Sequence, residues 1–413
     1  MKVTGIVAEY NPFHNGHKYQ LEFAREHLSS DYNVVVMSGD WVQRGAPAIY
    51  DKYSRAEVAL KNGADMVIEL PLIYSIASAE GFAKSAISLL NHTGIVNQLL
   101  FGGESTDLKL FSKASSILAN EPDEFQTTLR EKLSQGLSYP LARDYALRSC
   151  LTLPEEFLSS PNNILGLEYC KALLTSDSSI TPFVNKRIQN EYHDISIESN
   201  FASATAIRHV ITKRAIGEES VSDVPELLSH VMPDESVDQA SSLVPIIRED
   251  FSLLLNKALF DNTEYFNFTD CTDDISNKIL NNRNSFESWK QFAELLKSKD
   301  LTHTRISRVL SHILLNVTDD LYNLGASLDY APYLRILGWS KKGSELLPIL
   351  KENCDIPIIT TVSDAKDNLS PRRMQLLQKD IYAADIYSMV VSNKTGVKHS
   401  NEYTRKFDLV GLE

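Results

Sequence analysis

The sequence has few cysteines and no pattern among them. Cys150, Cys170, Cys271 and Cys354 are far apart, and none belongs to a Cys-x-x-Cys pair. Such spacing offers neither a zinc site nor a disulfide framework, and it agrees with a reducing compartment. We interpret the four thiols as packing residues, because free cysteine behaves as a small apolar side chain.

Long apolar runs are also lacking. No run approaches the roughly 20 apolar residues of a membrane-spanning helix. The first residues do not follow the charged-then-apolar order of a signal peptide. We therefore expect a cytoplasmic protein with no membrane partner.

Positive charge is scarce, and the formal net charge is −13 at pH 7. The field of the whole protein would repel a phosphate backbone, which argues against non-specific nucleic-acid binding. A nucleic-acid partner would have to meet a local basic patch.

Strands and helices are expected to alternate in the first hundred residues. Apolar runs at 2–9, 33–37, 64–70 and 96–101 are typical of buried strands, and helical periodicity separates them. This alternation predicts an α/β, Rossmann-like domain whose parallel sheet is covered on both faces. Ligands of such sheets collect at the carboxyl ends of the strands.

The rest of the chain is expected to be largely helical. Amphipathic runs occur at 247–259, 286–297 and 304–315, and residues 356–362 form the one convincing extended segment beyond the middle of the chain.

Residues 217–250 turn acidic and lose clear periodicity. We therefore predict two domains, 1–220 and a mostly helical 221–413, which suits a chain of 413 residues.

A phosphate-binding pattern follows the first strand. Asn11-Pro12 breaks regular structure, and His14-Asn15-Gly16-His17 then opens a helix. The first turn of a helix attracts anions, and two imidazoles three residues apart lie on one face there. Either histidine alone is more simply a packing or surface residue, but the whole run favours phosphate binding.

A second helix start lies at 203–208. Ser203, Thr205 and Arg208 provide two hydroxyls and a guanidinium, which binds phosphate oxygens in pairs. Alone, this is a capped helix with a surface arginine. Together with the first pattern, it favours a nucleotide site.

These two stretches resemble the nucleotidyltransferase superfamily that includes class I aminoacyl-tRNA synthetases. That superfamily has a His-x-Gly-His signature after its first strand and a distal Ile-Ser-Ser-Thr-x-Ile-Arg motif. Ala202 and Ala204 depart from the distal motif, so a hydroxyl contact to phosphate is not expected at 204.

A closer resemblance covers nearly the whole chain. The matching strings lie at 9–17, 37–39 with 43–45, 101–104, 161–166 and 192–193, and they resemble the bacterial tRNA(Met) cytidine acetate ligase family. One departure is Gly103, where the family is expected to have serine.

The resemblance implies a nucleotidyltransferase domain followed by a tRNA-binding domain, and a reaction in two steps. Acetate attacks the α-phosphate of ATP to give acetyl-adenylate and pyrophosphate. N4 of the wobble cytidine of elongator tRNA(Met) then attacks the acetyl carbonyl and releases AMP. The implied cofactors are ATP and the Mg²⁺ that accompanies ATP phosphates; the sequence has no metal-ligand cluster.

The resemblance also implies the residues of the site. The catalytic residues would be His14, His17 and Arg208. The ATP-binding residues would be Val7, Ala8, Glu9, Tyr10, Asn11, Pro12, Phe13, His14, Gly16, His17, Gln20, Gly102, Asn162, Arg187, Ile188, Ser203 and Thr205.

Basic residues outside these motifs are scattered. We expect some of the following to form the tRNA surface: Lys186, Arg187, Lys213, Arg214, Lys297, Lys299, Arg305, Arg308, Lys341, Lys342, Arg372 and Arg373. Lys52 and Arg55 could contact ATP phosphates or tRNA but are more simply a solvated helix face, and Arg44 is interpreted as a residue that gates the site.

Two alternatives remain open. One is a small-molecule adenylyltransferase or pantothenate-synthetase-like ligase that does not act on RNA. The other is a non-catalytic tRNA-binding protein. The long helical extension disfavours the first, and intact His14, Gly16, His17 and Arg208 disfavour the second.

Overall fold

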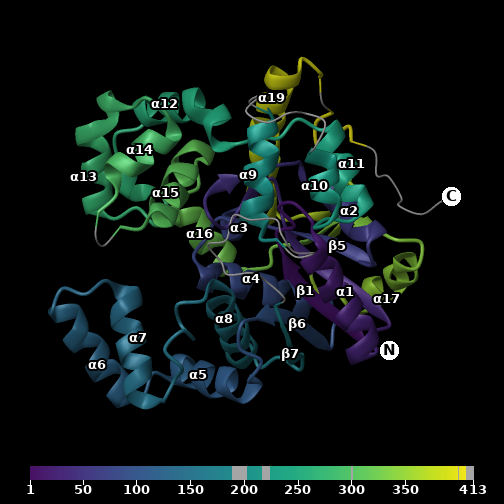
Figure 1. Ribbon diagram of the computed structural model, residues 1–413, viewed down its shortest axis with the longest axis horizontal. Coiled ribbons are helices and arrows are strands. Elements are labelled where there is room, and N and C mark those ends of the chain that lie inside the picture. The colour runs from purple at the N-terminus through teal and green to yellow at the C-terminus, as the bar shows by residue number, and fades with distance from the viewer. Residues whose placement is uncertain (188–201, 216–223, 299–300, 399, 406–413) are drawn as a thin grey trace.

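The computed structural model describes residues 1–187, 202–215, 224–298, 301–398 and 400–405. Its centre is a seven-stranded sheet with the order β7-β6-β1-β2-β5-β8-β9 (Figure 1). Strands β1 (Val3–Ala8), β2 (Tyr32–Ser38), β5 (Met66–Leu70), β6 (Gln98–Gly103) and β7 (Thr181–Lys186) are mutually parallel. The predicted α/β fold with a parallel sheet is confirmed.

Helices cover both faces of the sheet, as the alternation of side chains along a strand requires. Val35 and Met37 of β2 pack with α1 (Asn15–Leu28) and α2 (Lys52–Lys61). Val34 and Val36 point the other way, into a core shared with α4 (Ala79–His92), α5 (Leu108–Asn120) and α8 (Pro161–Thr175). Helices α6 (Asp123–Ser134) and α7 (Tyr139–Cys150) extend from this second layer as a hairpin (Figure 1).

The sheet also takes strands from the far end of the chain. β8 (Leu334–Trp339) pairs antiparallel with β5, and β9 (Ile358–Ile359) pairs parallel with β8. The interpretation of 356–362 as the one extended segment of this half was therefore wrong, because β8 was missed. Arg335 and Gly338 interrupt its apolar run, although Arg335 is buried. The division near residue 220 stays a prediction, and the sheet continues beyond it.

A separate helical layer lies over the carboxyl edge of the sheet. It contains α12 (Ser252–Asp261), α13 (Asp273–Asn282), α14 (Trp289–Leu296), α15 (His303–Leu315) and α16 (Asp319–Ala326). The hairpin of β3 (Trp41–Val42) and β4 (Ala46–Pro47) presses against α15. At its turn Gly45 has φ +62°, and a Cβ there would lie 2.3 Å from the main-chain nitrogen of Arg308. Only glycine fits this approach.

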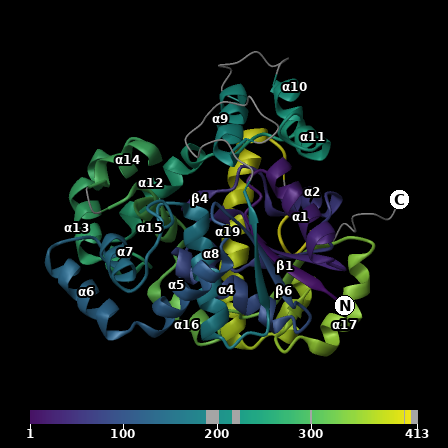
Figure 2. The same ribbon diagram turned by 60° about the horizontal axis from the view of Figure 1, so that its bottom comes forward.

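The long helix α19 (Pro371–Thr395) joins this helical layer to the sheet (Figure 2). Tyr387 donates a hydrogen bond to the Ala48 carbonyl at 2.9 Å, and the Trp41 indole donates to the Ala383 carbonyl at 3.3 Å. The remaining helices are α3 (Leu72–Ser75), α9 (Ala204–Ala215), α10 (Val224–Ser229), α11 (Asp234–Ser242), α17 (Leu346–Asn353) and α18 (Ala365–Asn368). Among the described helices, none combines the length and apolar character needed to cross a bilayer.

Lys52 and Arg55 are not a solvated face, so that interpretation was wrong. Both side chains are fully buried, and neither lines the main cavity. Lys52 Nζ lies 2.9 Å from Glu69 Oε1 and 3.3 Å from Glu402 Oε2. Arg335 pairs with the same two carboxylates. The sequence spacing looked amphipathic, but the carboxylates of Glu69 and Glu402, from distant segments, neutralise Lys52, and main-chain carbonyls accept hydrogen bonds from Arg55.

Glu402 should therefore matter more to stability than its place near the chain end indicates. Replacing it with glutamine leaves buried Lys52 and Arg335 short of one anion, and breaking such a pair costs about 3 kcal/mol or more of unfolding free energy. Denaturant titration at pH 7 measures the loss. Glu22→Gln, on the exposed side of α1, is the control. A Glu402→Gln protein as stable as the control would contradict this account.

The same pair predicts the direction of acid unfolding. Burial raises the pKa of Glu402, but Lys52 and Arg335 outweigh burial and lower it to about 2 from 4.5. A carboxyl whose pKa is lower in the folded state stabilises the fold above the unfolded value and loses that contribution as the pH falls. The stability difference between wild type and Glu402→Gln should shrink between about pH 4.5 and pH 2.

Candidate active site

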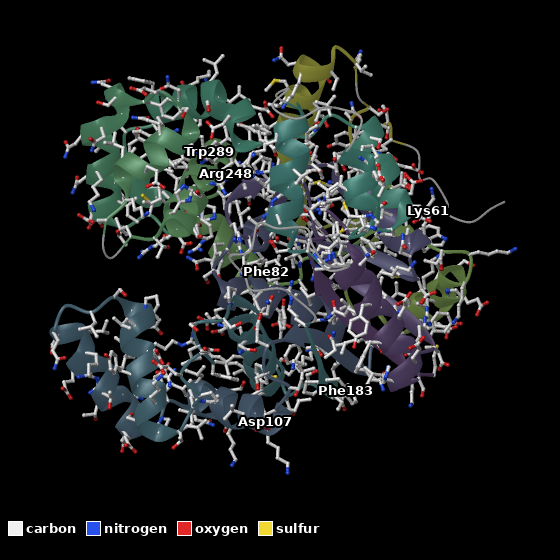
Figure 3. The ribbon with its side chains drawn as sticks, viewed as in Figure 1. Lys61, Phe82, Asp107, Phe183, Arg248 and Trp289 are labelled. Atoms are coloured by element: carbon white, nitrogen blue, oxygen red, sulfur yellow. The ribbon has the colours of Figure 1, made fainter. Side chains whose placement is uncertain are left out.

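A cavity of about 1040 Å³ opens at the carboxyl ends of β1 and β6. Its sheet side is formed by the start of α1, the start of α8, the end of β7 and the start of α9. Its other side is formed by the β3–β4 turn and by residues of α14 and α15. Phe82 of α4 and Arg248, which precedes α12, also line the cavity, and both are labelled in Figure 3.

The two histidines of the His-x-Gly-His run cap helix α1. His14 is the N-cap residue, and its Nδ1 accepts the Gly16 N–H at 3.1 Å. His17 Nδ1 accepts the His14 N–H at 3.2 Å, which completes a reciprocal capping box. The rings stack with centroids 3.7 Å apart. Because each Nδ1 accepts a backbone N–H, each neutral ring carries its proton on Nε2.

Both imidazoles are neutral at physiological pH. Burial, followed by the charges of Arg187 and Arg208, lowers the pKa of His14 to about 3. Burial, the neighbouring His14 and Arg187 lower the pKa of His17. His14 Nε2 is buried and has no hydrogen-bond partner in the described part of the chain. An anion that accepts this proton would satisfy the atom, because a buried unpaired donor costs free energy.

Gly16 makes the stacked histidines possible. A Cβ at this position would lie 2.9 Å from His14 Cε1. Any larger residue would therefore push the imidazole off the helix start.

The start of α9, which is the second predicted helix start, contacts the segment that precedes α1. Ser203 Oγ accepts the Ala206 N–H at 3.1 Å at the beginning of α9. Arg208 donates to the Asn11 carbonyl at 2.6 Å and to Thr205 Oγ1 at 3.1 Å. Burial lowers the pKa of Arg208 to about 10, so it remains a cation at neutral pH.

A third set of contacts closes the β6 side. Arg187 Nη1 donates to Asn162 Oδ1, and Asn162 Nδ2 donates to Glu104 Oε1 at 2.6 Å. A Cβ on Gly102 would lie 3.0 Å from Arg187 Cγ, so this glycine makes room for the arginine stem.

Asn163 stabilises a loop, unlike the adjacent Asn162. It does not line the cavity, and its Oδ1 accepts the N–H groups of Glu104 and Ser105. The loop is tight at Gly103, where a Cβ would lie 2.7 Å from the Ser105 carbonyl oxygen. This explains glycine at the position where the family is expected to have serine.

Most residues predicted for the site do line the cavity. They are Val7, Ala8, Glu9, Tyr10, Asn11, His14, Gly16, His17, Gln20, Gly102, Asn162, Arg187, Ser203, Thr205 and Arg208. Pro12 and Phe13 do not, and Phe13 is buried among the core residues of α1 and α2. Ile188, Tyr192 and His193 lie outside the described residues. That these residues bind ATP stays a prediction.

Sequence reasoning missed the walls of the cavity that come from other segments. An aromatic wall is formed by Phe82, Phe101 and Tyr169, and a basic wall by Arg248 and Lys290 together with Arg308, which the sequence had placed only in the expected tRNA surface. Phe82 and Tyr169 look like ordinary core positions of amphipathic helices, and no local pattern marks them. Arg44 also lines the cavity, on the β3–β4 turn, and its role as a gate stays a prediction.

The scattered basic residues do not gather on one surface. Lys342 donates to the Asp31 carbonyl at the sheet edge, whereas Arg372 donates to Ser327 Oγ in the helical layer. Arg308 lines the cavity and pairs with Asp270 at 2.8 Å. Lys299 and the side chain of Arg214 lie outside the described part.

Comparison with known proteins agrees with this geometry. The family described as HIGH Nucleotidyl Transferase matches residues 1–402. A tRNA(Met) cytidine acetate ligase of Acetivibrio thermocellus is 37% identical over 98% of this chain and 99% of its own. One of Clostridium perfringens is 38% identical over 98% of both chains. The chain belongs to the tRNA(Met) cytidine acetate ligase family of HIGH nucleotidyl transferases.

Solved structures show the same family fold. The apo crystal structure of Thermotoga maritima TmcAL matches all of this chain with a TM-score of 0.91 and 31% identity. A second crystal structure of that protein, bound with alpha-thio ATP, matches with a TM-score of 0.90 and 30% identity. The helical layer over the sheet is thus a feature shared with another family member.

The capping geometry predicts the effect of Gly16→Ala. The added methyl group displaces the His14 ring, so one donor to a bound phosphate is lost, while alanine favours the helix itself. We expect nucleotide affinity to fall about tenfold, the equivalent of one hydrogen bond. Calorimetric titration with ATP measures this, and the thermal midpoint reports the fold. Wild-type affinity in the variant would show that the ring can move without loss.

Proposed function

We propose that this protein acetylates N4 of the wobble cytidine of elongator tRNA(Met), using ATP and acetate. The observation that carries the proposal is the convergence of two neutral imidazole donors with Arg187 and Arg208 at one end of the cavity. Such a set fits a nucleoside triphosphate. The relatives named as tRNA(Met) cytidine acetate ligases support the choice of acetate and tRNA.

In the first step, a carboxylate oxygen of acetate attacks the α-phosphorus of ATP. The bond to pyrophosphate breaks, and negative charge grows on the phosphoryl oxygens and on the leaving group. Fixed donors aimed at that charge supply most of the catalysis in phosphoryl transfer. The Nε2–H groups of His14 and His17 would serve the α-phosphate, and Arg208 with Ser203 and Thr205 would hold the β- and γ-phosphates.

Neutral histidines suit this task. Arg187 and Arg208 already supply positive charge, and further charge on the stacked rings would repel them. A neutral Nε2–H still donates a directed hydrogen bond. The proton stays on the ring because the other nitrogen accepts a backbone N–H.

We propose that Mg²⁺ enters with ATP. The described residues contain no group of three or more His, Cys, Asp or Glu side chains placed to hold a metal ion. Mg²⁺ is commonly bound through substrate phosphates and water. The cavity residues would then hold the nucleotide, and the phosphates would hold the ion.

The tRNA would approach through the basic wall. Arg248 and Lys290 line the cavity on the side of the helical layer, beyond the residues assigned to ATP. Contacts from cations to backbone phosphates supply most of the affinity for a nucleic acid. We also propose that residues 221–413 act as the tRNA-binding region and that the protein works in the cytoplasm.

The reaction itself is tested with labelled acetate. Purified protein with ATP, Mg²⁺, labelled acetate and elongator tRNA(Met) should place label on N4-acetylcytidine, detected after nuclease digestion. The same tRNA with uridine at the wobble position is the control and should take up none. Label that enters only from acetyl-CoA would overturn the ligase proposal.

The role of His14 is tested by a pair of variants. His14→Ala removes both the helix cap and the Nε2–H donor, whereas His14→Asn keeps a capping side chain and removes only the donor. Both should lower acetate-dependent ATP–pyrophosphate exchange by about 10²-fold or more. His14→Ala alone should also lose about 1 kcal/mol of stability. Wild-type exchange in His14→Asn would remove this residue from the chemistry.

A further inference from the structure

A carboxylate stands in a cavity that is otherwise built for anions. Of the described residues that line it, only Glu9 and Glu249 are acidic, and the others are polar, apolar or basic. A negative charge near a triphosphate lowers affinity for it, because like charges repel. A role in nucleotide binding therefore does not explain the side chain of Glu9.

The two acidic residues are held differently. Glu249 is exposed, and its Oε2 accepts hydrogen bonds from Ser252 Oγ at 3.3 Å and from the Lys290 N–H at 3.5 Å. It thus organises the ends of neighbouring helices. Glu9 directly follows β1 at the floor of the cavity.

The Glu9 carboxylate is fixed by one oxygen. Its Oε1 accepts the Gln43 N–H at 2.9 Å, and its main-chain carbonyl accepts a hydrogen bond from buried Arg55. The structure gives Oε2 no hydrogen bond within the described residues, and the side chain is only half-buried. One carboxylate oxygen of this cavity-lining residue is therefore anchored, and the other has no hydrogen bond within the described residues.

The surroundings of Glu9 fit a flat heterocycle. After burial, its negative charge contributes to raising the pKa of Tyr169, and it favours the charged form of Arg208; all three residues line the cavity. Tyr169 belongs to the aromatic wall with Phe82 and Phe101. Aromatic side chains stack on bases that have left a nucleic-acid stack, and a carboxylate is the natural acceptor for the exocyclic amine of cytosine.

The transfer step also needs a proton acceptor. When N4 of cytosine attacks the acetyl carbonyl, the nitrogen becomes positively charged and must lose a proton. His14 and His17 cannot take it, because Nδ1 of each accepts a backbone N–H and Nε2 already carries a proton. The Glu9 side chain lines the same cavity, and its Oε2 has no hydrogen bond among the described residues.

We propose that Glu9 recognises N4 of the target cytosine and accepts its proton during acetyl transfer. This inference rests on the function proposed above. The new C–N bond forms as N4 attacks, the C–O bond to AMP breaks, and AMP leaves with the electron pair. One N4 proton passes to Glu9 Oε2 and then to solvent. Uracil presents an oxygen in place of the amine, so the same carboxylate repels it.

The proposal separates the two steps of the reaction. Glu9→Gln keeps an oxygen for the Gln43 N–H but cannot take a proton. Acetate-dependent ATP–pyrophosphate exchange should fall far less than acetyl transfer, because the substitution leaves the main chain of residue 9 unchanged. Single-turnover acetyl transfer from enzyme-bound acetyl-adenylate to elongator tRNA(Met) should fall by about 10²-fold or more. Glu22→Gln, outside the cavity, should change neither rate.

Other outcomes are decisive. Transfer at the wild-type rate in Glu9→Gln overturns the proposal and directs attention to His209 or His303 elsewhere in the lining. Equal losses in exchange and transfer also overturn it, since Glu9 would then serve the nucleotide. If Glu9→Gln does not fold, Glu9→Asp decides by the same comparison, with transfer reduced at least about tenfold and exchange reduced much less. Absence of transfer by the wild type would instead refute the proposed function.

Discussion

The active site depends on the burial of Arg55. Its guanidinium donates to the main-chain carbonyls of Tyr50, Glu9, Ser38 and Gly39, at 3.0 Å for Tyr50 and 3.1 Å for Ser38. These carbonyls end two parallel strands and the β3–β4 segment, so one side chain sets the spacing of the cavity floor. Burial lowers the pKa of Arg55, and the carbonyl dipoles supply the stabilisation that water no longer gives.

On that floor, the groups proposed to bind phosphate come from helix starts. His14 and His17 satisfy the backbone of α1 with their Nδ1 atoms and thereby fix their Nε2–H groups as donors. Arg208 bonds the Asn11 carbonyl and so ties the start of α9 to the end of β1. Capping and the proposed ligand binding use one arrangement, because the groups that complete the helix end also orient the donors.

The sequence predicted the parts of this site that are local. The strand, the Asn-Pro break and the His-x-Gly-His run are contiguous, and Ser203 to Arg208 again forms one turn of helix. The distant walls could not be predicted in this way. Phe82 and Tyr169 are nearly buried and share the periodicity of core residues. Lys52 and Arg55 have the spacing of a surface pair, and only their partners Glu69, Glu402 and the strand carbonyls explain their burial.

By itself the sequence determined the α/β class, the two helix starts that can receive phosphate, and the family to which these residues point. Local patterns suffice for these because hydrophobic period, capping residues and turn formers act over a few neighbouring positions. Only the tertiary structure decided that β8 and β9 extend the sheet, that the helical layer completes the cavity, and that Glu9 lines the same cavity as three aromatic side chains and Arg208. Those features arise from contacts between residues far apart in the chain, and such contacts leave no period in the sequence.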